Sequence, residues 1–327
     1  MIPIPHPEKT DLDTYCKSVI TYISSTANGN IALELINATL NKIEKGLTLY
    51  KLLHLETYQL DQLKSKFNYY KINILPKLIK PCFENPQDTW SQTYNRENIF
   101  YNKIITFEQM IYFYNEYMKI NGFDFMEGTG IKVCPYCNLN KISNGSVKRT
   151  SEFDHFIPKA AQEKYPLFAL CYYNLIPSCK TCNRFKSSDE IKILNPYDNQ
   201  LKNNTFYFVC KIGKKIDKVK IDLKTNEKDK IFVDALEGMK AKDKLDLEHL
   251  YSDYTDIVQD LWITSNLIKN KDYLNSVMMG YKDLHVTDIT FRKYILKRYD
   301  TEKDFLLQPL SKLTKDIAEQ FHIFDYI

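Results

Sequence analysis

Two C-x-x-C pairs constrain this 327-residue chain more than any other feature of its sequence. They are C-P-Y-C at positions 134–137 and C-K-T-C at positions 179–182. Each pair can bend to present two thiolates to one tetrahedral Zn²⁺, and two pairs complete a four-sulfur site. We therefore expect one structural zinc ion, held by Cys134, Cys137, Cys179 and Cys182. Because four thiolates leave no open coordination position, any chemistry must come from other residues.

A redox role for these cysteines is the main alternative. C-P-Y-C alone resembles a thioredoxin-type pair, but that interpretation requires a β-α setting and leaves the second pair unexplained. Disulfides are rare in the cytosol, where we expect this chain to stay: its start lacks the pattern of a signal peptide, and no apolar run approaches the roughly 20 residues of a membrane span. The remaining cysteines have apolar or aromatic neighbours and are expected to be inert buried thiols: Cys16, Cys82, Cys171 and Cys210.

The charge distribution adds a weaker signal. Hydrophobic residues make up 44% of the chain and charged residues 26%, which excludes a wholly disordered protein. The net charge is +4, from 45 basic and 41 acidic side chains. Residues 131–190 hold nine Lys or Arg and five Asp or Glu, so this segment alone carries +4. A phosphate-binding surface would show such an excess, and so would a solvated lysine-rich face.

Hydrophobic periodicity predicts helices on both sides of the cysteine-marked segment. Apolar residues recur every three to five positions from residue 11 to about residue 125, and again from residue 231 to the C-terminus. Between them, residues 205–221 alternate apolar and polar side chains around Gly213, Lys214 and Lys215, as in a β-hairpin. Prolines 76, 81 and 86 predict a linker between two helical groups, and M-E-G-T-G at positions 126–130 predicts a hinge.

These patterns predict a mainly α protein with a small inserted zinc module and a β-hairpin. We divide it into a helical domain (1–125), the zinc module (126–200), and the hairpin with a C-terminal helical domain (201–327). The zinc module contains E-F-D-H-F-I-P-K at positions 152–159, followed by N-L at 174–175 and C-N-R-F-K at 182–186. Taken alone each of these is a weak signal, because a half-buried histidine or a capping asparagine is common.

In this order, and bracketed by the two cysteine pairs, these residues resemble the HNH endonucleases of the ββα-metal class. That family carries Asp-His on its first strand, an Asn-Leu step between strand and helix, and His or Asn on the helix. The matching positions here are Asp154-His155, Asn174-Leu175 and Asn183. The zinc-bearing branch places one C-x-x-C before the Asp-His and another just ahead of the helical residue. The resemblance covers about residues 133–188, and Asn183 stands where many members carry His.

The resemblance implies a catalytic role for each matched residue. Asp154 and Asn183 would give oxygen ligands to one divalent cation, Mg²⁺ with Mn²⁺ as the alternative. His155 would take a proton from the attacking water as general base, and Asn174 would hold the loop that orients His155. Basic residues would contact the sugar-phosphate backbone, with a solvated side chain as the alternative for each. These are Lys159, Arg184 and Lys186.

The implied function is a metal-dependent endonuclease that hydrolyses DNA phosphodiester bonds. The layout resembles the PtuB-type HNH effectors of bacterial anti-phage defence, which implies an ATPase partner subunit. One alternative is RNA cleavage, because the phosphate chemistry is shared. Another is a non-catalytic, zinc-containing nucleic-acid-binding or scaffold protein. A degenerate module of that kind would be expected to lose Asp154, His155 or Asn183, and all three are present.

Overall fold

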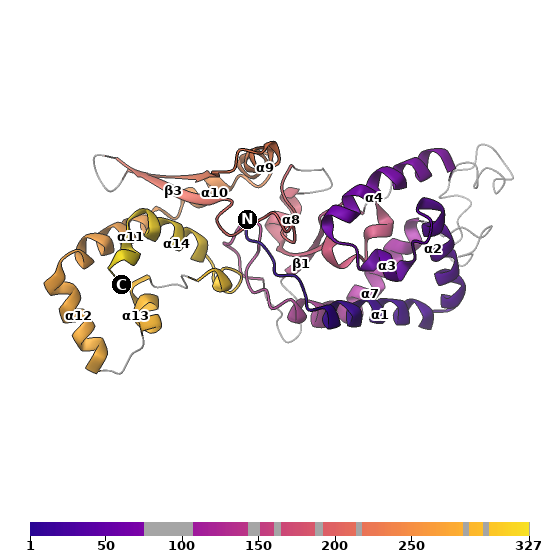
Figure 1. The fold of residues 1–327 in the computed structure, drawn as a ribbon, viewed down its shortest axis with the longest axis horizontal. Helices are drawn as coiled ribbons and strands as arrows, with labels where there is room; N and C mark the ends of the chain where they lie inside the picture. The colour runs from indigo at the N-terminus through magenta and orange to yellow at the C-terminus, as the bar shows by residue number, and fades with distance from the viewer. Residues whose placement is uncertain are drawn as a thin grey trace. The chain divides into compact units, whose positions relative to one another are not determined.

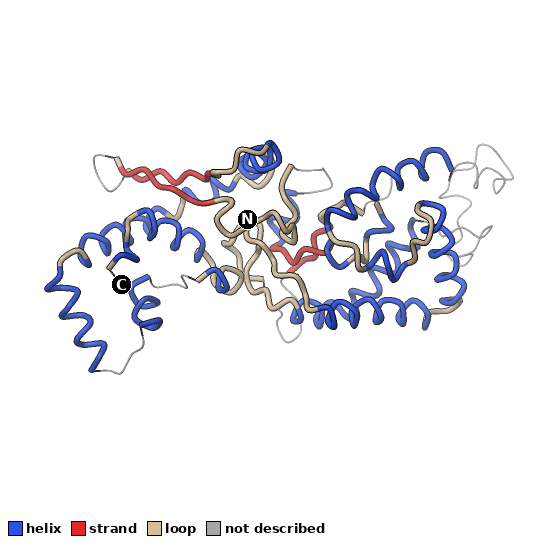
Figure 2. Tube along the Cα trace, in the orientation of Figure 1, coloured by secondary structure: helices blue, strands red, loops and turns tan. Residues whose placement is uncertain are grey.

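The computed structural model describes residues 1–74, 107–142, 151–159, 165–186, 192–213, 218–283, 288–296 and 301–326. Within these ranges the protein is mainly helical and carries two two-stranded sheets (Figures 1 and 2). The predicted mainly α fold and the β-hairpin are therefore confirmed. The residues of the predicted proline linker, Cys82, Lys214 and Lys215 lie outside the described residues.

Two compact units make up the chain, and each draws on segments that are distant in sequence. Unit 1 comprises Met1–Ile4, Gly130–Glu152 and Pro177–Ile327, and unit 2 comprises Pro5–Thr129 and Phe153–Ile176. The three consecutive domains expected from the sequence stay a prediction. One boundary falls inside the expected hinge, between Thr129 and Gly130. There Gly130 has a φ of +66°, a left-handed conformation that glycine adopts without strain.

Unit 2 is built on amphipathic helices. The described helices are α1 (Lys9–Ser25), α2 (Gly29–Ile43), α3 (Leu49–Leu53), α4 (Thr57–Tyr69) and α7 (Phe107–Gly128). A π-helical turn, η1 (Tyr70–Ile74), extends α4, and two short 3₁₀ turns, η4 (Pro166–Phe168) and η5 (Tyr172–Asn174), lie between the strands of the first sheet in sequence. Helix α1 buries one apolar stripe at helical spacing and packs on α2: Leu12, Tyr15, Cys16, Val19 and Ile23.

Aromatic contacts fix the 3₁₀ segment of unit 2 against its helices. The Tyr15 hydroxyl donates a 2.8 Å hydrogen bond to the Leu170 carbonyl. Phe168 stacks on Tyr165 with ring centroids 5.5 Å apart, and both rings contact Phe67 of α4. Buried aromatic pairs of this kind add packing energy beyond the area they bury. The backbone around residue 169, which matters for the site, is therefore rigidly placed within unit 2.

In unit 1 the second sheet is a hairpin whose edges are covered by helical side chains. Strands β3 (Tyr207–Ile212) and β4 (Val219–Lys224) pair antiparallel, with Phe208 opposite Leu223. On the β3 edge, the Phe208 N–H donates to Asp316 at 2.9 Å and the Cys210 N–H to Gln320 at 2.9 Å. Both acceptors lie on helix α14 (Ser311–Gln320). Covering an edge in this way blocks pairing with other chains.

Helices complete unit 1. They are α8 (Lys180–Lys186), α9 (Lys230–Lys240), α10 (Leu247–Ser252), α11 (Thr255–Ile268), α12 (Lys271–Asp283) and α13 (Asp288–Leu296), with 3₁₀ turns η6 (Glu302–Asp304) and η7 (Ile323–Asp325). Helix α8 follows directly on strand β2 (Leu175–Cys179), which pairs with β1 (Ser151–His155) in the first sheet. The order around the cysteines is thus strand, strand, helix, and each unit holds one end of this sheet.

Asn138 joins the first cysteine pair to the C-terminal part of unit 1. It has a left-handed φ of +51° and is 1% exposed. Its Nδ2 donates to the Phe305 carbonyl at 2.6 Å, and its Oδ1 accepts from the Lys312 N–H at 3.0 Å. Just before it, the Cys137 carbonyl accepts a 2.7 Å hydrogen bond from the buried Tyr251 hydroxyl. These contacts anchor the first cysteine pair in the packed interior of unit 1.

Among the residues that the structure describes, no helix combines the length and apolar character needed to cross a membrane.

Candidate functional site

Four cysteine sulfur atoms meet in unit 1, as the sequence predicts. The Sγ atoms of the two C-x-x-C pairs all lie within 4.8 Å of one another, and all four residues are buried. They come from the turn after residue 133, the end of β2 and the first turn of α8: Cys134, Cys137, Cys179 and Cys182. Four sulfur ligands in a closed, buried cluster could hold a structural metal ion such as zinc.

Hydrogen bonds to the sulfurs support the fit to a metal. The backbone N–H of Leu139 donates to Cys137 Sγ at 3.4 Å, and that of Cys182 donates to Cys179 Sγ at 3.4 Å. Asn140 Nδ2 adds a 3.3 Å contact to the same Cys179 sulfur. Donors that point at sulfur stabilise the thiolate, which is the form that binds metal. The donor set therefore suits a thiophilic cation.

Proton sharing within the cluster points the same way. Hydrogen bonds from the Cys134 thiol and the other two thiols hold the pKa of Cys179 far below its ordinary value, and the Cys134 thiol also lowers the pKa of Cys137. Burial raises the pKa of Cys134, and the neighbouring sulfurs raise that of Cys182. The four sulfurs thus differ in how readily they lose a proton, and metal binding to the cluster would release protons.

The three described cysteines outside the cluster have the properties of inert thiols. Burial raises the pKa of Cys16 to about 12 and that of Cys210 to about 11. Burial also raises the pKa of Cys171 well above its usual range. Such thiols carry little thiolate and are poor metal ligands or nucleophiles.

His155 is the last residue of strand β1 and lies in unit 2. Its side chain is 8% exposed, and its Nε2 lies 3.0 Å from the Ala169 carbonyl oxygen. Because a carbonyl oxygen can only accept, Nε2 carries the proton, and the lone pair of the neutral ring is on Nδ1. The ring also meets Tyr114 of α7 edge to face, with centroids 4.5 Å apart. His155 is thus fixed in both tautomer and orientation.

Asn174 holds the loop that follows β1 by hydrogen bonds, while its predicted role in catalysis stays a prediction. Its side chain is fully buried, and its Oδ1 accepts from the Ile157 N–H at 2.6 Å. Its Nδ2 donates to the Ile157 carbonyl at 3.1 Å and to the Phe168 carbonyl at 3.0 Å. One amide therefore ties the loop after His155 to the turn that ends at Ala169. The Asn174 side chain thus holds in place both the loop after His155 and the turn before Ala169.

Lys159 lies two residues beyond that locked position. Its Nζ sits 3.5 Å from the centroid of the Tyr114 ring, a close cation–π contact. Burial lowers the pKa of the Lys159 ammonium to about 8. No carboxylate within the described ranges pairs with it. The predicted phosphate contact of Lys159 remains a prediction.

The two predicted ligands of the catalytic cation belong to different units. Asp154 is 3% exposed and lies in unit 2, whereas Asn183 is half-buried on α8 in unit 1. Asn183 Nδ2 donates a 2.6 Å hydrogen bond to Glu152 Oε2. A carboxylate oxygen accepts only, so the amide nitrogen faces Glu152 and Oδ1 is the atom left to bind a cation. The meeting of Asp154 and Asn183 at one ion stays a prediction.

The basic residues of α8 differ in exposure. Arg184 is exposed, which suits a contact with a nucleic-acid backbone. Lys186 is only 2% exposed. The phosphate contacts expected of Lys186 and Arg184 stay predictions.

Three residues at the site are not predicted from the sequence. Tyr114 has the helical spacing of a core residue and is only 8% exposed, and its ring contacts both His155 and Lys159. Ala169 contributes through its backbone carbonyl, which no side-chain pattern reveals. Glu152 offered a usable signal, since it precedes Asp154 by two positions on a strand and therefore shares a strand face with it.

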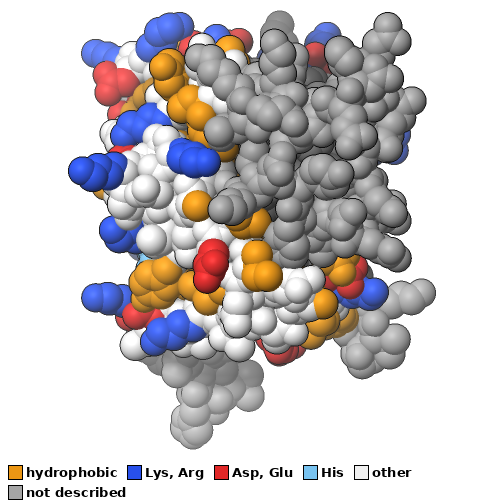
Figure 3. Space-filling view, turned by 90° about the vertical axis from the view of Figure 1, so that its right-hand side faces the viewer, with side chains coloured by type: hydrophobic (Ala, Val, Ile, Leu, Met, Phe, Trp, Pro, Cys, Tyr) orange, Lys and Arg blue, Asp and Glu red, His pale blue; other side chains and the backbone are white. Residues whose placement is uncertain are grey.

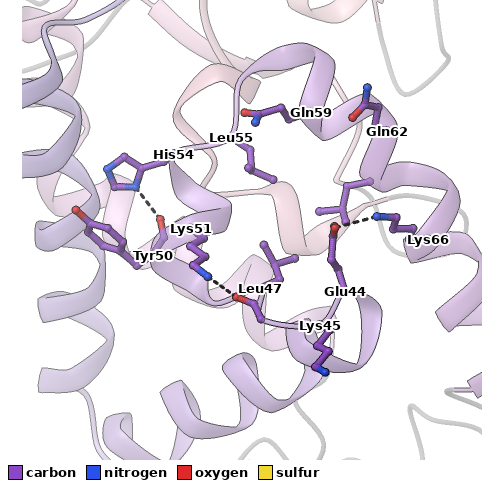
Figure 4. A pocket seen from close by; sticks show the side chains of 12 residues that line it. Glu44, Lys45, Leu47, Tyr50, Lys51, His54, Leu55, Gln59, Gln62 and Lys66 are labelled. Atoms are coloured by element: carbon purple, nitrogen blue, oxygen red, sulfur yellow. Dashed lines mark hydrogen bonds and ion pairs between the residues drawn. The ribbon is translucent and has the colours of Figure 1, made fainter.

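Unit 2 also contains a pocket away from these residues. It has a volume of about 520 Å³ and is lined by residues of α3, α4 and the loops beside them (Figure 4). Its charged side chains are largely satisfied: Lys66 pairs with Glu44 at 2.9 Å, and Lys51 donates to the Gly46 carbonyl at 2.7 Å. On the part of the face in Figure 3 that is not drawn in grey, basic, acidic and hydrophobic side chains are interspersed, which is ordinary for a protein surface.

Comparison with known proteins gives one partial relative. A 60-residue stretch of the chain is 38% identical to "Protein ea31" of Escherichia phage lambda. The match covers 18% of this chain and 17% of that protein, so it spans less than a fifth of either. No family model matches the chain, and no solved structure matches it.

Proposed function

We propose that this protein is a metal-dependent endonuclease of the HNH type that hydrolyses phosphodiester bonds in DNA. The observation that carries the proposal is the setting of His155. Its Nε2 donates to a backbone carbonyl, and the segments on both sides of that contact are tied together by the buried amide of Asn174. A histidine held in one tautomer, with its lone pair on a defined nitrogen, is equipped to act as a general base.

His155 removes a proton from water through Nδ1. Imidazole exchanges protons near neutral pH more readily than any other side chain, so it can generate hydroxide for in-line attack on phosphorus. The Ala169 carbonyl accepts the hydrogen bond from Nε2–H. It can still do so after Nδ1 is protonated, so this hydrogen bond also stabilises the imidazolium. The proton gained at Nδ1 is later released to solvent.

Asp154 and Asn183 would hold the catalytic cation. A carboxylate and an amide oxygen are hard ligands, which suits Mg²⁺ and also admits Mn²⁺. Glu152 supports this assignment because its carboxylate turns the Asn183 amide so that Oδ1 is available. When bound, the cation stabilises the charge that develops on the phosphoryl oxygens and on the leaving 3′ oxygen. The cysteine-bound metal would be purely structural.

The substrate is assigned from charge. Residues 131–190 carry the whole net positive charge of the chain, and this excess favours a polyanion. Lys159, Arg184 and Lys186 are the candidates for contacts to the sugar-phosphate backbone. DNA is the first choice by resemblance to the HNH family. An RNA-cleaving enzyme and a non-catalytic nucleic-acid-binding scaffold are the alternatives.

The biological setting proposed is anti-phage defence in the bacterial cytoplasm together with an ATPase partner subunit. Its support is the resemblance to PtuB-type effectors and the large helical parts that surround a small strand-strand-helix module. Co-purification with an ATPase encoded nearby would support the partner. A lone protein with full, regulated cleavage would count against it.

The test is a cleavage assay with duplex DNA, single-stranded DNA and structured RNA, each with Mg²⁺, with Mn²⁺ and with EDTA. The proposal expects metal-dependent cleavage of DNA that is lost in Asp154→Ala. Preference for structured RNA would select the ribonuclease alternative. Tight DNA binding without cleavage in any metal would select the scaffold alternative.

A further inference from the structure

Lys159 is an ammonium group held in an unusual way. Burial lowers its pKa to about 8, and its Nζ lies over the Tyr114 ring, 3.5 Å from the ring centroid. A partly buried cation normally has a carboxylate partner, and within the described ranges none pairs with it. A partly buried ammonium gains a charged partner when an anion binds beside it.

The Lys159 side chain is held at its charged end, and the backbone two residues before it is held as well. Its backbone follows Ile157, whose N–H and carbonyl are both bound by the Asn174 amide at 2.6 and 3.1 Å. Its charged end rests on the Tyr114 ring. Lysine normally loses considerable rotamer entropy when it binds a ligand, and this loss is reduced when the side chain is already ordered.

The same ring also contacts His155. Its centroid lies 4.5 Å from the imidazole centroid at an interplanar angle of 75°, so the imidazole and the ammonium share one aromatic neighbour. Tyr114 belongs to α7, outside the cysteine-marked segment in sequence. All three residues lie in unit 2. A helix of the surrounding protein therefore contributes to the arrangement of the site.

We propose that Tyr114 is a positioning residue that holds the Lys159 ammonium against the ring shared with His155, so that Lys159 binds a non-bridging oxygen of the phosphate that His155-activated water attacks. This inference rests on the proposed function. An ordered cation at that oxygen compensates the negative charge that builds up in the transition state. The Tyr114 hydroxyl is not required for this role, because the ring face makes the contact.

The contact between the Lys159 ammonium and the Tyr114 ring can be tested without measuring activity. Reductive ¹³C-dimethylation of lysines gives each lysine an NMR signal, and a methyl group over an aromatic face is shifted upfield. The Lys159 signal, assigned with Lys159→Arg, should be shifted in the wild type and in Tyr114→Phe. It should move to the ordinary lysine position in Tyr114→Leu. Tyr112→Leu, at an exposed position of the same helix, is the matched control and should leave the signal in place.

The functional role is tested by single-turnover cleavage. We expect Tyr114→Leu and Lys159→Met each to slow cleavage by about 100-fold, and Tyr114→Phe to stay within about threefold of the wild type. If Tyr114 acts through Lys159, the double variant Tyr114→Leu/Lys159→Met cleaves no more slowly than Lys159→Met alone. A general loss of structure would instead make the two effects multiply.

The outcomes separate the two proposals. The inference is overturned if Tyr114→Leu cleaves as fast as an active wild type. It is also overturned if the NMR shift of the Lys159 methyl groups is the same in Tyr114→Leu as in the wild type. In both cases the nuclease proposal stands. If the wild type cleaves no nucleic acid, the proposed function fails, and the phosphate role of Lys159 fails with it.

Discussion

The Nε2 atom of His155 lies 3.0 Å from the carbonyl oxygen of Ala169. This contact decides which nitrogen of the ring can accept a proton, and it depends on a turn that is packed against α1 and α4 through Leu170 and Phe168. The chemistry proposed for His155 is therefore a consequence of how unit 2 folds. Each residue that fixes this turn becomes a place to test the account.

Asn174→Ala should impair both stability and cleavage. The substitution removes three hydrogen bonds and leaves the Ile157 N–H and two carbonyls without that partner. We expect the free energy of unfolding to fall by about 2–4 kcal/mol. Urea denaturation measures this change. Asn73→Ala, at an exposed residue whose side chain donates to the Tyr69 carbonyl, should change it by less than about 0.5 kcal/mol. Equal effects would contradict the role given to Asn174.

Cys179→Ser should release the structural metal. Cys179 accepts hydrogen bonds from both Cys182 N–H and Asn140, so its sulfur is central to the cluster. Elemental analysis of protein purified without chelators should find one zinc per chain in the wild type and little in the variant. Stability should fall by several kcal/mol because metal binding and folding are coupled. Cys210 is a buried thiol outside the cluster, so Cys210→Ser should retain the zinc. Loss of zinc from Cys210→Ser, or a wild type without zinc, would refute the assignment of the four cysteines as a zinc site.

Lys312→Met should destabilise unit 1. Lys312 and Asp316 form a buried pair on α14, with Lys312 Nζ 2.6 Å from Asp316 Oδ2, and removing the ammonium leaves the carboxylate without its counter-charge. Burial already raises the pKa of Asp316. We expect a loss of about 3–5 kcal/mol in the free energy of unfolding. Lys315→Ala breaks a more exposed pair with Glu319 on the same helix and should cost less than about 1 kcal/mol. Similar costs for the two variants would argue against a buried pair.

The stability contributed at Lys159 should depend on pH. Burial lowers its pKa from 10.5 to about 8. Between these values the unfolded chain binds more protons at this position than the folded chain does, so the free energy of unfolding rises with pH over that interval. Lys159→Met lacks this rise.

Denaturation of wild type and Lys159→Met at several pH values between about 7 and about 10 checks this. The stability difference should shift in favour of the wild type as pH increases above about 8. The exposed Lys17→Met is the control for general effects of removing a lysine. Parallel profiles for wild type and Lys159→Met would show that the ammonium is not buried as described.

The sequence predicts the parts of the site that follow from spacing. Two C-x-x-C pairs predict a shared metal site, and the structure brings the four sulfurs together within 4.8 Å. The alternation around Gly213 predicts the β3–β4 hairpin, and helical periodicity predicts α1 and α9, because these patterns record which side chains are buried. The loop-holding role of Asn174, implied by resemblance, is supported by its three hydrogen bonds.

Other parts depend on tertiary packing that no local pattern encodes. Ala169 acts through a backbone atom, so its side chain carries no information about the role. Tyr114 has the spacing of a core residue and is indeed buried, and its contact with Lys159 exists only because α7 packs near the loop after β1. The division into units is also invisible in the sequence, since each unit combines segments that are far apart along the chain.

The most direct test of the account is the single-turnover rate of DNA cleavage in Mg²⁺ for the wild type and His155→Ala. The exposed His249→Ala serves as the matched control. Zinc content and the free energy of unfolding are measured on the same samples. We predict that His155→Ala retains zinc and a folded structure but loses cleavage by at least about 100-fold, while His249→Ala cleaves like the wild type. Cleavage by zinc-loaded His155→Ala at the wild-type rate would contradict the central claim that this imidazole is the general base.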